Sequence, residues 1–285
     1  MDEILASLWK QVEQAIDRAL AEDLSFGDVT TESLIPPDQQ GRAAIIAGEE
    51  GVLAGVEVAK EVFLRVDPSI RFEALVQDGA KVRKGDVVAV IDGKAASILK
   101  GERVALNFLI RLSGIASETA RYVEATKGLK AWITDTRKTT PGIRPLEKYA
   151  VRVGGGKNHR QHLGDGILIK DNHLAVFRSL GLGIKEAIQR ARQSSTMKIE
   201  VEVENVGEGE EALEAGADAL LLDNMAIKDM RRVVELAQGR ALIEASGGIT
   251  LDNVRQVAET GVDLISVGAL THSARSLDLS LELEA

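Results

Sequence analysis

Four short apolar segments in the last third of the chain begin at residues 199, 219, 241 and 263, so successive segments start 20 or 22 residues apart. A stretch with helical periodicity lies between each pair of neighbours, and strands that alternate with helices form parallel sheets. This spacing suits the strands of an α/β barrel and is too short for a doubly wound sheet with insertions. The regular spacing therefore predicts a barrel.

The chain is expected to have two parts that differ in the order of their strands and helices. The second half has predicted strands at 131–135, 167–170, 199–203, 219–222, 241–245 and 263–267, and helices at 184–192, 208–215, 227–237 and 251–260. The first part has predicted helices at 4–20, at 56–66 and from about residue 101, and strands at 42–47 and 70–76. We therefore predict an N-terminal α+β domain over 1–115 and an α/β barrel with fewer than eight strands over 116–274, with the tail 275–285 packed on the first domain.

Composition excludes several classes of protein. The 285 residues include no cysteine, which excludes thiol catalysis and Cys-ligated zinc and fits a reducing compartment. A net charge of −9 and only nine aromatic residues argue against nucleic-acid binding. No segment approaches the ~20 apolar residues of a membrane span. Because the start, Met1–Glu3, is acidic where a secretory signal is basic, we expect a cytoplasmic protein.

Every predicted barrel strand ends in polar or glycine-rich residues. These ends are 135–140, 170–173, 202 with 204–205, 223–224, 246–248 and 268–269. Barrel enzymes build their sites from such strand ends. A single polar strand end is explained by ordinary capping. Polar or glycine-rich ends on all six predicted strands indicate a binding site at that end of the barrel.

A basic segment lies within this acidic chain. Residues 137–173 contain eight Lys or Arg and three acidic residues, a net charge of +5, and three of the four histidines. A solvated basic face is the simplest explanation of a charge run. Here a run of three glycines, 154–156, lies within the segment, and two of its basic residues lie at strand ends. These features favour a ligand with several negative charges.

Alternation places carboxylates inside the barrel. Between 199 and 205, Glu200, Glu202 and Glu204 share one face and the valines share the other. The layer between strands and outer helices is apolar, so the glutamates are expected to face the interior. Buried carboxylates need cations or donors, and Lys138 and Lys170 are the expected partners. The alternative is an edge strand whose glutamates lie in water.

Glycines at the last two strand ends indicate a phosphate site. Ser246–Gly248 precedes a helix and Gly268–Ala269 ends the last strand. Glycine lets backbone N–H groups approach a phosphate, and barrels often bind phosphate there. With acids at Glu202 and Asp223 for sugar hydroxyls or Mg²⁺, the features describe a phosphate-binding barrel enzyme. A Schiff-base aldolase that uses Lys170 fits the same description.

A series of motifs then covers nearly the whole chain in order. The most distinctive is Asp135-Thr136-Arg137-Lys138-Thr139-Thr140, and the others lie at 27–31, 101–107, 146–151, 154–160, 168–173, 222–224, 246–248 and 267–273. The set closely resembles the quinolinate phosphoribosyltransferase family, also called carboxylating nicotinate-nucleotide pyrophosphorylases. The resemblance implies a type II phosphoribosyltransferase-like barrel that joins quinolinate to 5-phosphoribosyl-1-pyrophosphate. The products are nicotinate mononucleotide, pyrophosphate and CO₂, in NAD biosynthesis.

The resemblance also implies residue roles. Those implied for binding the two carboxylates of quinolinate are Arg103, Arg137, His159 and Arg160, and Thr136 is implied for substrate binding. Those implied for catalysis and for ligand anions, ribose hydroxyls or Mg²⁺ are Lys138, Lys170, Glu202 and Asp223, with Glu202 and Asp223 as the metal ligands. Those implied for the 5′-phosphate are Ser246, Gly247, Gly248, Val267, Gly268 and Ala269.

The resemblance further implies the assembly and the cofactors. It implies a homodimer, or a hexamer built as a trimer of dimers, in which Arg103 reaches the neighbouring subunit's site. Mg²⁺ accompanies the ribosyl donor, and no organic cofactor is implied. The chain departs from the family at His162, where many members have glycine, and this predicts at most a modest change in pocket shape.

Two alternative functions stay open on the sequence. One is a related phosphoribosyltransferase that acts on another aromatic acid or belongs with molybdate-transport genes. The other is a non-catalytic anion-binding module. Three arginines with His159 favour a dicarboxylate, and Glu202 with Asp223 favours catalysis over anion capture.

Overall fold

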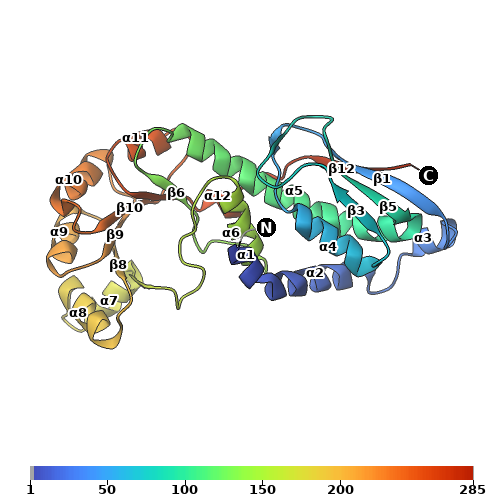
Figure 1. Cartoon of the computed structure of the whole chain (residues 1–285). Coiled ribbons are helices and arrows are strands. Elements are labelled where there is room, and N and C mark those ends of the chain that lie inside the picture. The colour runs from blue at the N-terminus through green and yellow to red at the C-terminus, as the bar shows by residue number, and fades with distance from the viewer. Residues whose placement is uncertain (1–2, 285) are drawn as a thin grey trace. The chain divides into compact units, whose positions relative to one another are not determined.

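The computed structural model describes residues 3–284 in two compact units (Figure 1). Met1 and Asp2 of the acidic start, and Ala285 of the predicted tail, lie outside the described residues. The described parts of Met1–Ala120, Thr139–Gly155 and Ala269–Ala285 form the first unit, and Arg121–Lys138 with Gly156–Gly268 form the second. No helix among residues 3–284 is long and apolar enough to cross a membrane.

The second unit is a six-stranded parallel sheet in the order β6-β11-β10-β9-β8-β7. Its strands are β6 (Trp132–Thr134), β7 (Ile167–Ile169), β8 (Ile199–Val203), β9 (Ala219–Asp223), β10 (Leu242–Ser246) and β11 (Leu264–Ser266). All six predicted barrel strands are confirmed to within one residue at each end. The sheet is an incomplete barrel, which confirms the predicted fold class.

Helices cover the outer side of this sheet (Figure 1). They are α7 (Asp171–Ser179), α8 (Ile184–Ser194), α9 (Val206–Glu214), α10 (Ile227–Ala237) and α11 (Val254–Ala258). Val201 and Val203 of β8 are fully buried. Helix α9 begins earlier than predicted because the Asn205 side chain accepts a hydrogen bond from the N–H of Glu208 and caps it.

Two expectations for these helices differ from the structure. Helix α11 is shorter than the predicted 251–260, because the residues before it form a turn in which Asn253 Oδ1 accepts from the N–H of Thr250 at 2.9 Å. Helix α7 was not predicted, since its first residues had been interpreted as a polar strand end.

The first unit is an antiparallel sheet with helices. Its four-stranded sheet has the order β12-β1-β5-β3, formed by β1 (Gln40–Ala47), β3 (Arg71–Ala74), β5 (Val87–Lys94) and β12 (Leu279–Glu284). A small second sheet pairs β2 (Gly51–Val52) with β4 (Lys81–Val82). The helices are α1 (Glu3–Ser7), α2 (Trp9–Leu24), α3 (Val29–Leu34), α4 (Val56–Val66), α6 (Arg144–Val153), α12 (Ala269–His272) and most of α5 (Ala95–Ala125), whose residues from Arg121 on are assigned to the second unit.

Segments far apart in the sequence complete this first unit. Strand β12 pairs with β1 from Arg42↔Glu284 to Ala47↔Leu279. Helix α6 is strongly amphipathic, and it packs against α1, α2 and α12. For this reason residues 139–155 belong to the first unit by packing, although the sequence ranges had placed them with the barrel.

A buried ion pair ties these segments together. Glu147 on α6 is fully buried, and its Oε1 accepts from Arg111 Nη2 of α5 at 2.8 Å. The backbone N–H and the hydroxyl of Thr140 also donate to this carboxylate, at 2.9 and 2.8 Å. Arg111 donates to the carbonyl oxygens of Thr271 and Ala274 as well. One guanidinium therefore joins α5, α6 and the segment that begins at α12.

We predict that Glu147→Ala lowers the free energy of unfolding by on the order of 3 kcal/mol, because it leaves Arg111 without its buried partner. Urea unfolding followed by circular dichroism measures the change. Glu235→Ala, which breaks an exposed pair with Arg232, should cost less than about 1 kcal/mol. Equal losses in the two variants would contradict the role of the buried pair.

Candidate functional site

A cavity of about 410 Å³ opens in the second unit. Its lining residues are Thr136, Arg137, Lys138, His159, Arg160, Leu168, Lys170, Glu202, Leu221, Asp223, Glu244, Ser246 and Ser266. The structure thus brings together all four residues predicted for catalysis and most of those predicted for substrate binding. Of the remaining predicted residues, Gly247, Gly248, Val267, Gly268 and Ala269 follow strand ends outside this lining, and Arg103 lies in the first unit.

Strand register explains why these side chains meet. Glu202 of β8 and Glu244 of β10 both pair with Leu221 of β9, so the two carboxylates lie at one level of the sheet. Asp223 pairs with Ser246 two residues further along. Because successive side chains alternate between faces, all five residues lie on the same face of the sheet. The register of the three strands therefore places the polar side chains of the cavity next to one another.

Lys170 and Glu202 form an ion pair in the cavity. Lys170 Nζ lies 3.2 Å from Glu202 Oε2, so the structure joins two residues that alternation and charge had paired. The lysine side chain is 45% exposed, whereas the carboxylate is 9% exposed. Lys170 immediately precedes α7, and its backbone N–H donates to His173 Nδ1 at 2.9 Å. The ammonium is thus held at the opening of the cavity, where a ligand anion can reach it.

Two arginines add like charges nearby. Burial and the positive charge of Arg137 together lower the pKa of Arg160. Arg160 Nη1 donates to the carbonyl oxygen of Gly166 at 3.2 Å. Like charges held this close favour a bound anion, because an anion offsets their repulsion.

The backbone that carries Arg160 is anchored by Asp135. The Asp135 carboxylate is fully buried. It accepts from Asn158 Nδ2 at 2.6 Å and from the backbone N–H of His159 at 2.9 Å. The loop is thereby joined to the end of β6, the strand that Asp135 follows.

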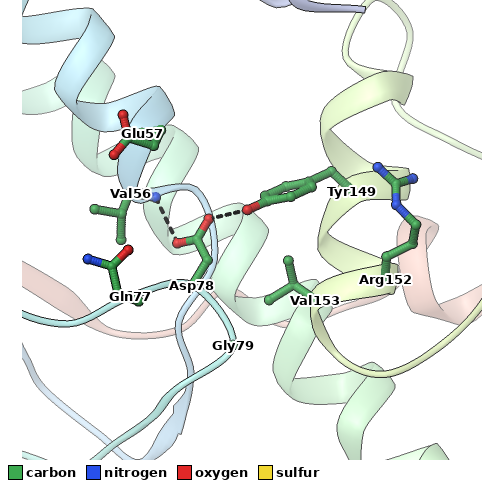
Figure 2. Close-up of a pocket in the computed structure, with 8 residues that line it drawn as sticks. All are labelled: Val56, Glu57, Gln77, Asp78, Gly79, Tyr149, Arg152 and Val153. Atoms are coloured by element: carbon green, nitrogen blue, oxygen red, sulfur yellow. Dashed lines mark hydrogen bonds between the residues drawn. The ribbon is translucent and has the colours of Figure 1, made fainter. Parts of the chain in front are cut away.

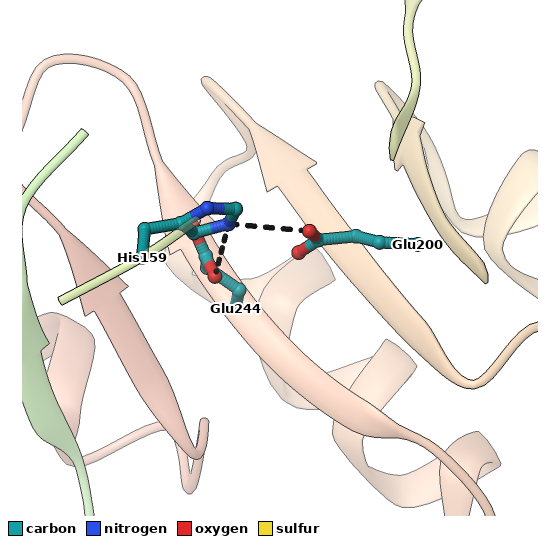
Figure 3. Close-up of side chains that lie close together, drawn as sticks. All are labelled: His159, Glu200 and Glu244. Atoms are coloured by element: carbon teal, nitrogen blue, oxygen red, sulfur yellow. Dashed lines mark ion pairs between the residues drawn. The ribbon is translucent and has the colours of Figure 1, made fainter. Parts of the chain in front are cut away.

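His159 lies between two carboxylates (Figure 3). Its Nε2 is 3.2 Å from Glu200 Oε2 and 3.4 Å from Glu244 Oε2. Burial alone would lower the pKa of His159, but the hydrogen bonds and charges of the two carboxylates outweigh it and raise the pKa. Burial raises the pKa of Glu244. The cluster therefore binds an extra proton strongly.

The second ring nitrogen decides where that proton resides. The backbone N–H of Arg160 donates to His159 Nδ1 at 2.8 Å, so Nδ1 must keep its lone pair. An imidazolium would lose this bond. If the proton that an imidazolium would carry on Nδ1 instead resides on Glu244, the hydrogen bond from Arg160 to Nδ1 and the net charge of the cluster are both kept. Glu244 Oε1 is buried with no hydrogen-bond partner among the described residues. An unpaired oxygen costs less in a neutral carboxyl group than in a carboxylate. We therefore assign a neutral Glu244 and a neutral His159 protonated at Nε2.

The pattern of the sequence indicated no specific role for Glu200 or Glu244. Glu200 was expected to face the interior but was given no partner other than lysine. Glu244 was missed, although a single acidic residue inside the apolar segment 241–245 is a signal that could have found it. Both contact one histidine nitrogen from strands β8 and β10, which are separated by β9.

The loop after β10 has two consecutive residues in a backbone conformation that favours glycine. Gly247 and Gly248 have φ values of +85° and +61°, a conformation that favours glycine. A Cβ at Gly247 would collide with the side chain of Asn224. Asn224, itself at φ +51°, donates its backbone N–H to Ser246 O at 2.9 Å. Close packing of two strand ends therefore requires the glycine at 247, and the positive φ favours the glycine at 248.

The first unit has cavities of its own. One of about 230 Å³ is lined in part by Arg103, Asn107 and Arg111. Another, of about 440 Å³, lies at the start of α4 (Figure 2). There the Asp78 carboxylate accepts from Tyr149 Oη at 2.5 Å and from the backbone N–H of Val56 at 3.0 Å. Asp78 thus caps α4, which is a structural role.

Comparison with known proteins agrees with this geometry. Residues 28–113 and 115–282 match the N-terminal and C-terminal domains of the family described as quinolinate phosphoribosyl transferase. A Bacillus subtilis protein named probable nicotinate-nucleotide pyrophosphorylase [carboxylating] is 44% identical over 275 residues, covering 96% of this chain and 93% of that protein. A Mycobacterium leprae protein named nicotinate-nucleotide pyrophosphorylase [carboxylating] is 42% identical and covers 94% of this chain and 95% of its own.

A solved structure gives the same result in three dimensions. The crystal structure of NadC from Streptococcus pyogenes superposes with a TM-score of 0.91 at 42% identity and covers 96% of each chain. Its likeness extends over both units of the chain. Since family matches cover both halves and the polar residues converge on one cavity, this chain belongs to the quinolinate phosphoribosyltransferase family.

Proposed function

We propose that this protein transfers the phosphoribosyl group of 5-phosphoribosyl-1-pyrophosphate to quinolinate with loss of CO₂, forming nicotinate mononucleotide and pyrophosphate for NAD biosynthesis. The observation that carries the proposal is one cavity that is lined both by four cations, Arg137, Lys138, Arg160 and Lys170, and by the carboxylates of Glu202 and Asp223. The named activity of relatives at 42–44% identity supports it.

The cations divide between the two substrates by their geometry. A guanidinium matches a planar carboxylate with two parallel hydrogen bonds, so Arg137 and Arg160 bind the carboxylates of quinolinate. An ammonium acts as a point charge, so Lys138 and Lys170 bind the pyrophosphate of the donor. When the donor binds, Lys170 breaks its ion pair with Glu202 and pairs with the ligand anion instead. The 45% exposure of the lysine side chain permits this movement. Thr136 Oγ1 accepts from the backbone N–H of Lys138 at 3.0 Å and keeps the loop in place.

The reaction needs positioning more than covalent help. The bond from ribose C1′ to pyrophosphate breaks, its electron pair leaves with pyrophosphate, and the lone pair of the quinolinate nitrogen forms the new bond to C1′. The transition state resembles an oxocarbenium ion, which the negative charges of Glu202 and Asp223 stabilise. Their oxygens also accept hydrogen bonds from the ribose hydroxyls. The ring nitrogen becomes cationic and accepts the electrons released when the 2-carboxylate leaves as CO₂, and a proton then replaces it on C2.

The backbone after the last strands holds the 5′-phosphate. Ser246, Gly247 and Gly248 offer N–H groups at the end of β10, and Val267, Gly268 and Ala269 do so at the end of β11. Phosphate oxygens accept from such groups, and a barrel often binds phosphate on its last two strands. This contact fixes the ribose at one end, while the lysines fix the pyrophosphate at the other.

Glu202 and Asp223 also have the chemistry of Mg²⁺ ligands. Mg²⁺ prefers oxygen donors and binds through one or two carboxylates together with substrate phosphates. These two carboxylates lie on the neighbouring strands β8 and β9 in the same cavity, so the donor set fits the ion. When bound, Mg²⁺ neutralises charge on the leaving pyrophosphate. No organic cofactor is needed, because the substrate ring itself accepts the electrons.

Arg103 enters the proposal through the assembly. It lies on α5 of the first unit, which also carries Asn107 and Arg111. We propose a homodimer, or a hexamer of three such dimers, in which Arg103 of one chain binds a quinolinate carboxylate in the partner's cavity. The lack of cysteine fits work in the reducing cytoplasm.

The first prediction from the proposed function is that purified protein with quinolinate, the ribosyl donor and Mg²⁺ forms nicotinate mononucleotide and releases CO₂ from carboxyl-labelled quinolinate. Chelation by EDTA should stop turnover, and added Mg²⁺ should restore it. Nicotinate should be a poor substrate, since it leaves part of the arginine site unpaired. No product with quinolinate under these conditions would refute the proposed function.

The second prediction concerns Lys170. Lys170→Ala should lower kcat by on the order of 10²–10³, the cost of one preorganised charged contact. A modest fall in melting temperature should accompany this large loss of turnover, because Glu202, 9% exposed, loses its ion-pair partner. Lys185→Ala, an exposed lysine on α8, is the matched control. Near-normal turnover in Lys170→Ala would rule out its catalytic role.

The third prediction tests the shared site by mixing inactive subunits. Arg103→Ala and Lys170→Ala proteins should each be inactive. After even re-mixing, half the dimers are mixed and each has one intact site, so activity should return to about a quarter of wild type. Subunit exchange is verified by mass labelling. If exchange occurs without recovery, Arg103 serves its own chain.

A further inference from the structure

The cluster of His159, Glu200 and Glu244 has two possible uses that the reaction above does not assign. One imidazole and two carboxylates lie with their ligand atoms within 4.8 Å of one another, a composition that suits a metal ion. The same atoms can instead form hydrogen bonds through one shared proton. The ring's other nitrogen distinguishes the two uses.

A metal ion does not fit the hydrogen bonds of the ring. A histidine that binds a metal through Nε2 carries its proton on Nδ1 and donates it to a nearby oxygen. Here Nδ1 accepts the N–H of Arg160 at 2.8 Å, so the proton must be on Nε2, the atom a metal would need. The Nε2–H then points between Glu200 Oε2 and Glu244 Oε2. The geometry favours the shared hydrogen bond.

The same contacts leave His159 no free nitrogen for a substrate. Nε2 is used by the two carboxylates, and Nδ1 by the next residue's backbone. The resemblance implies that His159 binds a carboxylate of quinolinate. In the structure its ring lines the cavity and also links the strands β8 and β10 to the main chain of Arg160, whose guanidinium lines the same cavity.

We propose that Glu200 and Glu244 are positioning residues that lock His159 in its Nε2–H tautomer, and that the locked ring holds Arg160 where its guanidinium meets quinolinate. The role of Arg160 rests on the proposed function, whereas the tautomer is a property of the protein alone. Together with Asp135, which holds the N–H of His159 at 2.9 Å, the ring fixes consecutive backbone amides of the loop. Glu244 acts as a neutral acceptor in this arrangement.

The first test needs no substrate. In ¹⁵N-histidine-labelled wild-type protein, the resonances of His159 should show a protonated Nε2 and a bare Nδ1, assigned by their loss in His159→Asn. Added Mg²⁺, Mn²⁺ or Zn²⁺ should leave them unchanged. A doubly protonated ring, a proton on Nδ1, or a shift caused by the metal alone would overturn the proposal.

The second test separates a neutral acceptor from a charge. Glu244→Gln keeps an acceptor oxygen and should change KM for quinolinate by less than about threefold, whereas Glu244→Leu should raise it roughly 10- to 100-fold, as expected for a group displaced by about 1 Å. KM for the ribosyl donor should stay within about twofold in both variants. Glu210→Gln, on the exposed side of α9, is the control for loss of charge. Equal damage from Gln and Leu would overturn the neutral-acceptor role.

The third test asks whether Glu244 acts through His159. In a His159→Asn background, Glu244→Leu should add less than about a twofold change in KM for quinolinate, because residues that act through one another are not additive. A purely structural loss, or direct contact between Glu244 and substrate, would add its full effect in both backgrounds and overturn the proposal. If wild-type protein makes no product, the proposed function fails, while the tautomer result still decides this inference.

Discussion

Burial of charge inside the parallel sheet is the constraint on which the site depends. Glu244 is 1% exposed and Glu202 is 9% exposed, and each buried carboxyl group needs a donor. Glu202 is paired with Lys170, and Glu244 with His159. The chain therefore has to bring a lysine from the end of β7 and a histidine from an irregular loop into the cavity. The same physical requirement holds the first unit together, where fully buried Glu147 is paired with Arg111.

The strands and the cavity could be predicted because they follow from local patterns. Apolar segments gave all six barrel strands, the last four at regular spacing, and alternation placed Glu202 on the interior face beside Lys170. Polar residues at strand ends indicated the mouth, because parallel strands end at one edge. These inferences need only the period of a strand and the apolar nature of the layer under the helices.

What could not be predicted depends on partners that are distant in sequence. Nothing near Glu244 in the sequence shows that its partner is His159, 85 residues earlier, or that Glu200 shares the same proton. Helix α6 follows the first barrel strand, yet its apolar face packs on α1, α2 and α12. Sequence order assigned residues 139–155 to the barrel, whereas packing assigns them to the first unit. The functional roles of Arg103 and the glycine loops still rest on the resemblance.

The cavity holds its cations close together at an electrostatic cost that the fold must offset. Burial and Arg137 lower the pKa of Arg160, which measures how unfavourable its charge is there. A mobile arginine would move into water to escape this cost. Arg160 is prevented from doing so because its backbone N–H is bound to His159, whose own N–H is bound to Asp135. The loop therefore keeps like charges in place before any anion arrives, so that little reorganisation is needed when it binds. The buried carboxyl groups and the cations therefore act together, because the cations alone could not maintain the geometry in which they bind an anion.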